Sequence, residues 1–104
     1  MDGAWIVELE VRMGTFMGGS APAMARQVCD GYTLLSTTSL KRLTVDQMQQ
    51  LEFEMDKKLR LTRGEQPDLN DQPALQERNR RIFRIEGQLR VLRHAAQQKK
   101  MGRL

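Results

Sequence analysis

Arginines are concentrated in the C-terminal third of the chain, where their side chains could bind phosphate or another anion. The candidate anion contacts are Arg80, Arg81, Arg84, Arg90 and Arg93. Guanidinium groups bind phosphate oxygens through paired hydrogen bonds, so this set could contact a nucleic-acid backbone. The alternative is a solvated helix face, in which some of these arginines pair with Glu52, Glu54 and Asp56 of a neighbouring helix.

The distribution of charge also agrees with an anionic partner. The chain has a formal net charge of +4, and residues 66–104 contain nine basic and four acidic residues. The positive charge therefore belongs to the C-terminal segment, although it falls short of a dedicated polybasic arm. No helix-turn-helix or zinc-finger spacing accompanies it. A small basic nucleic-acid-binding protein is therefore the alternative function and not the favoured one.

The other reactive side chains do not form a catalytic or metal-binding motif. The chain has one cysteine, Cys29, and one histidine, His94, and no motif connects them. The glycines Gly14, Gly18 and Gly19 are not followed by the Gly-Lys-Ser/Thr of a phosphate-binding loop. We therefore expect a non-enzymatic protein with no cofactor and no metal.

The single cysteine and the short apolar runs of the sequence favour a cytoplasmic location. A single cysteine cannot form an intramolecular disulfide, which fits a reducing compartment. Apolar runs are only a few residues long, so no membrane span is expected. Residues 1–25 lack the positive start and the apolar stretch of a signal peptide. Met24 is an alternative start of the natural protein, which would make residues 1–23 an upstream extension.

These side chains must be positioned by the secondary structure of the chain. Residues 1–43 are expected to form an N-terminal segment of short strands and loops. Apolar and polar residues alternate from Trp5 to Met13, and this period of two predicts a strand. Residues 32–39 are rich in β-branched and apolar types, which predicts a second strand. Between them, an N-cap serine, a first-turn proline and a final glycine predict a short helix over residues 22–30.

Residues 44–104 are expected to form an antiparallel helical hairpin. Thr44 and Gln47 make a capping box at the start of a helix over residues 44–63. A second helix over residues 73–99 has apolar residues at heptad spacing. Two helices joined by a short loop usually fold back on each other. The expected fold class is mainly α, a two-helix hairpin preceded by one or two short β-strands, with an α+β arrangement as the alternative.

The hairpin leaves apolar residues outside its expected seam. The candidate interface residues are Phe53, Leu61, Phe83, Gly87 and Val91. Gly87 in mid-helix costs about 1 kcal/mol relative to alanine, and close approach of another backbone would explain it. Either the N-terminal strands or a second subunit could cover these residues. The favoured function is a small protein-interaction module that binds a protein partner or self-associates, as a dimer or larger homo-oligomer, through apolar helix faces.

One stretch of the second helix resembles a known family. Residues 84–90, Arg-Ile-Glu-Gly-Gln-Leu-Arg, are similar to a stretch in the first helix of copper-sensing repressors, which are all-helical DNA-binding oligomers. In that family a metal-binding cysteine and further helices follow the stretch, whereas no cysteine follows it here. The resemblance therefore implies a similarly built arginine-rich amphipathic helix and not membership of the family.

Overall fold

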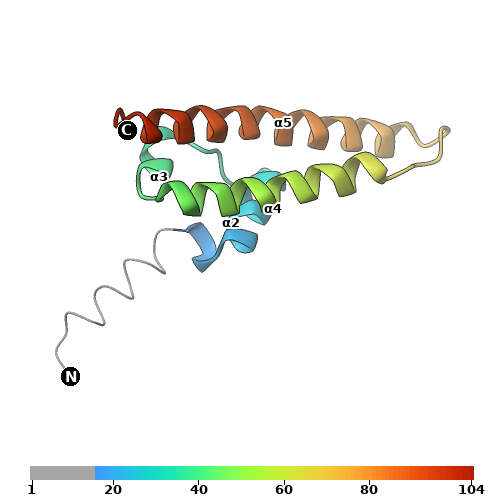
Figure 1. The fold of residues 1–104 in the computed structure, drawn as a ribbon. Helices are drawn as coiled ribbons and strands as arrows, with labels where there is room; N and C mark the ends of the chain where they lie inside the picture. The colour runs from blue at the N-terminus through green and yellow to red at the C-terminus, as the bar shows by residue number, and fades with distance from the viewer. Residues whose placement is uncertain (1–15) are drawn as a thin grey trace, which may run out of the picture.

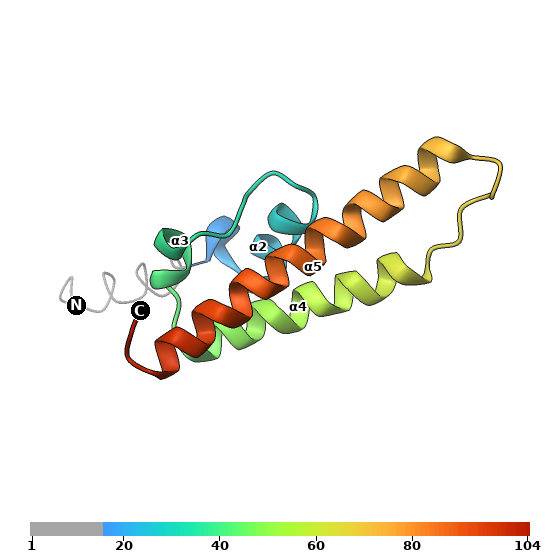
Figure 2. The same ribbon diagram turned by 90° about the horizontal axis from the view of Figure 1, so that it is seen from above.

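The computed structural model describes residues 16–104, and this part of the chain is mainly α-helical (Figure 1). Its elements are a 3-10 turn, η1 (Met17–Gly19), and the helices α2 (Ala21–Cys29), α3 (Thr37–Lys41), α4 (Val45–Gly64) and α5 (Gln72–Lys100). The two long helices, α4 and α5, run antiparallel and side by side, and α2 lies against the middle of the pair (Figure 1, Figure 2). The predicted mainly α class is therefore confirmed.

Local capping explains where the two long helices begin. Thr44 Oγ1 accepts a hydrogen bond from the Gln47 N–H (3.1 Å), and Gln47 Oε1 accepts one from the Thr44 N–H (2.8 Å). Asp71 Oδ1 accepts a hydrogen bond from the Ala74 N–H (3.1 Å) at the start of α5. Such caps satisfy backbone N–H groups that have no partner within the helix. The helices predicted over 44–63 and 73–99 agree closely with α4 and α5.

One hydrophobic core joins α2 and α3 to the hairpin. Its largest fully buried side chains are Met24, Val28, Cys29, Leu40, Leu43, Met48, Leu51, Met55, Ile85, Leu89 and Leu92. The members from α4 and α5 recur every three or four residues, which places them on one side of each helix. The residues from α2 complete the core, so the seam between α4 and α5 is not closed by those two helices alone.

The strand predicted over residues 32–39 is wrong. The chain forms a loop after α2 and then the short helix α3, whose N-cap is Ser36. Ser36 Oγ accepts a hydrogen bond from the Ser39 N–H (3.3 Å), and Ser39 Oγ accepts one from the Ser36 N–H (3.0 Å). This capping box gives the backbone local partners that a strand would not use, and it outweighs the weak strand preference of the threonines.

The remaining N-terminal predictions have different outcomes. No strand occurs within residues 16–104, and the strand predicted from Trp5 to Met13 lies outside the described residues. The short helix predicted over residues 22–30 is confirmed as α2. Ser20 Oγ caps it by accepting a hydrogen bond from the Ala23 N–H (3.2 Å).

Candidate interaction surface

The basic residues of α5 stabilise the ends of the other helices. Arg78 lies where α4 ends, and its guanidinium donates hydrogen bonds to the carbonyl oxygens of Arg63 (2.8 Å) and Glu65 (2.9 Å). Lys99 lies beyond the end of α3 and donates to the carbonyl oxygens of Lys41 (2.9 Å) and Leu43 (2.6 Å). Carbonyl groups at a helix C-terminus lack partners within the helix and carry partial negative charge, so a cation there is favourable.

Two arginines of α5 donate hydrogen bonds to the C-terminal end of α2 in the same way. Arg84 donates a hydrogen bond to the Cys29 carbonyl oxygen (3.1 Å). Arg81 forms an ion pair with Asp30 (2.5 Å) and donates from Nε to Thr62 Oγ1 (3.3 Å). Gly31 leaves room for this arrangement, because a Cβ there would lie 3.0 Å from the Arg84 guanidinium carbon and its φ is +86°.

The structure therefore does not bring the five predicted anion contacts together as one free surface. Arg81 and Arg84 hold the end of α2, and Arg93 forms an ion pair with Glu52 (2.8 Å). Arg80 is exposed and pairs with Glu77 one turn earlier (2.9 Å). Of these five, only Arg90 is exposed with a guanidinium group that has no hydrogen bond or ion pair in the part of the chain that the structure describes.

The outer side of α5, away from α4, carries an apolar line formed by Phe83, Gly87 and Val91. The Phe83 side chain is 74% exposed and Val91 is 37% exposed. A Cβ at Gly87 would meet only Arg90 Nη2, at 3.7 Å. No packing contact within the described chain thus requires a glycine at position 87.

The loop between α2 and α3 adds two apolar residues that the sequence analysis did not identify. Tyr32 is 84% exposed and Leu34 is 72% exposed. The Leu35 N–H donates a hydrogen bond to Gln88 Oε1 (2.6 Å), which holds this loop beside α5. Because this segment was predicted to be a strand, the exposure of both residues was not expected. Exposed apolar residues indicate an interaction surface where they form a contiguous patch.

The outer side of α4 carries the other two predicted interface residues. Phe53 is 60% exposed, and Leu61, two turns later, is also exposed. The Lys57 ammonium group lies 5.9 Å from the centre of the Phe53 ring. All four large interface residues are therefore at the surface, two on each long helix.

The two side chains considered for catalysis lie apart in the fold. Cys29 is buried in the core, and burial raises the pKa of its thiol to about 11. A thiol that stays protonated at neutral pH is a poor nucleophile. His94 is exposed on the C-terminal half of α5. Within residues 16–104, no three His, Cys, Asp or Glu side chains lie close enough together to hold a metal ion.

Comparisons of this chain with protein-family models, curated proteins and solved structures gave no match. In the described residues, none of the helices combines the length and the apolar character needed to cross a membrane.

Proposed function

We propose that this protein is a small non-enzymatic interaction module that self-associates through the apolar outer sides of α4 and α5. The observation that carries the proposal is the line of Phe83, Gly87 and Val91, in which both large side chains are exposed, on a helix whose opposite side is used in the core. Exposed apolar surface of this kind is typical of interaction sites. Burying it against another chain would add apolar contact that a domain of this size cannot make internally.

The glycine strengthens the argument. An alanine at position 87 would favour the helix by about 1 kcal/mol, and the described chain leaves room for it. A glycine is useful at this place if another chain approaches the backbone of α5 closely. The exposed loop residues Tyr32 and Leu34 could add to the contact, because the loop is held beside α5 by the hydrogen bond between Leu35 and Gln88.

Sedimentation velocity tests self-association directly. We expect the wild-type protein to form dimers or larger species over a range of concentrations, and Phe83→Asp to shift it to monomers. Gln76→Asp is the matched control, because it introduces the same charge at an exposed position of the same helix. Circular dichroism of each variant should show unchanged helix content. A wild-type protein that stays monomeric at all concentrations would contradict the proposal.

A second candidate function is binding of nucleic acid. It is favoured by Arg90, which is exposed and has no partner among the described residues, and by Arg80 on the same side of α5. The internal contacts of Arg81, Arg84 and Arg93 leave few cations for a phosphate backbone. The test is binding to generic duplex DNA and RNA at low and high salt, with Arg80→Glu/Arg90→Glu as the variant. Phosphate binding predicts a steep loss of affinity with salt, and no binding at low salt would exclude this function.

We also propose a cytoplasmic location. A lone, buried, protonated cysteine is compatible with a reducing compartment. Fluorescence microscopy of a tagged protein in its natural cell tests this, and accumulation outside the cytoplasm would contradict it.

A further inference from the structure

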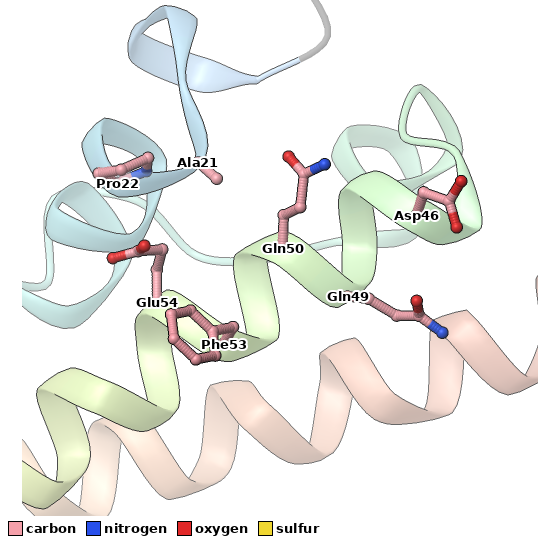
Figure 3. A pocket seen from close by; sticks show the side chains of 7 residues that line it. All are labelled: Ala21, Pro22, Asp46, Gln49, Gln50, Phe53 and Glu54. Carbon is pink, nitrogen blue, oxygen red and sulfur yellow. The ribbon is translucent and has the colours of Figure 1, made fainter.

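Two hollows on the surface have opposite charge. The first, called the acidic hollow, has a volume of about 540 Å³ and lies between the start of α2 and the first half of α4 (Figure 3). Phe53 stands in its wall, and the charged residues that line it within the described part of the chain are Asp46 and Glu54. Figure 3 shows these residues along α4, with Ala21 and Pro22 of α2 opposite them.

The second, called the basic hollow, has a volume of about 500 Å³ and lies between α3, the C-terminal half of α5 and residues 103–104. Leu40, Val91 and Ala95 contribute apolar surface to it. Its charged lining side chains are those of Arg90 and Arg103, and no Asp or Glu side chain of the described residues lines it. Neither guanidinium group has a hydrogen bond or ion pair with another residue in the range 16–104, so both charges are available to a partner.

We propose that Phe53 of one copy inserts into the basic hollow of a second copy, with Asp46 and Glu54 facing Arg90 and Arg103. This inference rests on the self-association proposed above and specifies which surfaces meet. A second copy is the occupant because each chain carries both of the complementary surfaces. One surface has an aromatic side chain near two carboxylates, and the other is an apolar hollow with guanidinium groups at its edge.

The spacing of the apolar residues fits this arrangement. Phe53 and Leu61 on α4 are eight residues apart, as are Phe83 and Val91 on α5. Each pair therefore spans about 12 Å along its helix, at a rise of 1.5 Å per residue. If α4 of one copy lies antiparallel to α5 of the next, Phe53 meets Val91 while Leu61 meets Phe83.

The same register explains the glycine. It places Lys57, which lies midway between Phe53 and Leu61, opposite Gly87, midway between Phe83 and Val91. The absence of a side chain at Gly87 leaves space for the aliphatic stem of that lysine. All five interface residues expected from the sequence then belong to one contact.

The two kinds of interaction contribute differently. Burial of the Phe53 ring and of its apolar neighbours supplies most of the affinity, because aromatic rings bury a large area. The charged groups lie at the edges and Glu54 also pairs with Lys57 in its own chain (3.5 Å), so each contributes little free energy. Their role is to orient the two chains and to reject surfaces of like charge.

This contact is head-to-tail, because it joins two different surfaces. Each copy would offer one Phe53 and one basic hollow, so assembly continues beyond a dimer unless a ring closes. A symmetric contact, by contrast, would stop at a dimer. The mass of the wild-type assembly at high concentration therefore distinguishes the two arrangements.

A complementation experiment tests the proposal. Phe53→Asp removes the inserting side chain and leaves the basic hollow intact, whereas Val91→Glu blocks the hollow and leaves Phe53 intact. We expect each variant alone to sediment as a monomer of 12.0 kDa. An equimolar mixture should give a 1:1 complex of twice that mass and nothing larger, because each variant retains one functional half of the contact. Leu69→Asp, in the exposed loop before α5, is the control and should assemble like the wild type.

The outcomes separate this inference from the proposed function. Suppose that the wild type associates and that Phe83→Asp abolishes association. If Phe53→Asp then has no effect, or if the two folded variants stay monomeric when mixed, the head-to-tail contact is wrong and self-association stands. A monomeric wild type would overturn both. Raising the salt concentration from about 50 mM to about 500 mM should weaken wild-type association and have a smaller effect on Arg90→Gln.

Discussion

Arg81 and Arg90 lie on the same helix, yet their surroundings differ completely. Arg81 faces the rest of the fold and bonds to Asp30, to Thr62 and, more weakly, to the Cys29 carbonyl oxygen. Arg90 lies on the outer side, and its guanidinium group has no hydrogen bond or ion pair within the described residues. The comparison shows that position around the helix, and not residue type, decides which cations of α5 are available to a partner.

The apolar residues on the inner and outer sides of α5 differ in the same way as these two arginines. Leu89 is 1% exposed in the core, whereas Phe83, six residues earlier, projects from the outer side. The inner side of α5 thus holds α2, α3 and α4 together, and the outer side is left for another molecule. Four substitutions test this division, beginning with the largest expected effect on stability.

Leu89→Ala should lower the free energy of unfolding by about 3 kcal/mol, because it removes buried apolar atoms and leaves a cavity in the core. Urea unfolding followed by circular dichroism measures this loss. Phe83→Ala is the counterpart on the outer side and should change the stability of the monomer by less than about 0.5 kcal/mol. Equal losses for the two variants, measured at a concentration where the protein is monomeric, would show that the two sides do not differ.

Arg81→Ala should cost about 1–2 kcal/mol, since Asp30, Thr62 and the end of α2 lose a charged hydrogen-bond donor. Arg81→Lys keeps the charge but not the branched guanidinium, so it should recover only part of the loss. Arg90→Ala is the matched control and should have little effect on unfolding. Thermal denaturation of the three variants under the same conditions checks the ranking.

Gln88→Ala should cost about 1 kcal/mol, because the Leu35 N–H loses the side-chain oxygen that accepts its hydrogen bond. Hydrogen exchange at Leu35 provides a local measurement, and its protection should fall by more than the global change in stability explains. Gln76→Ala, at an exposed position of the same helix, should leave that protection unchanged. Unaltered exchange at Leu35 in Gln88→Ala would mean that this contact does not hold the loop.

Gly87→Ala should have the smallest effect on folding and the opposite sign. We expect a gain of about 0.5–1 kcal/mol in monomer stability, because alanine favours the helix and its Cβ meets no close neighbour. The same variant should self-associate less tightly, since the added methyl group occupies the space left for a second chain. A variant that is more stable and associates as well as the wild type would remove the role assigned to this glycine.

Much of the hairpin could be predicted because its signals are local. The capping box of Thr44 and Gln47 lies within one turn, and the apolar stripes of α4 and α5 recur at the helical period. The segment after α2 was predicted incorrectly because its amino-acid composition was a weaker signal than its local and tertiary contacts. Its β-branched composition suggested a strand, but the cap at Ser36 and the contact of Leu35 with Gln88 decided the outcome.

The candidate surface was only partly predictable. Exposure of Phe53, Leu61 and Phe83 follows from their place off the buried stripes, and the structure agrees. The exposure of Tyr32 and Leu34 could not be predicted in this way, because it depends on a loop that is held by a hydrogen bond to a helix more than fifty residues later. The match between the two hollows likewise depends on α2 and α3, which lie outside the hairpin.

The amino-acid sequence alone determined the two long helices and the sides on which their apolar residues lie, because hydrogen bonds and side-chain spacing within a helix are set by neighbours one turn away. Only the tertiary structure decided what each arginine of α5 does. Arg81 meets Asp30 across 51 positions of the chain, so its role depends on where α2 packs. Helical spacing cannot encode that placement, because it arises from the shared burial of several elements in one core.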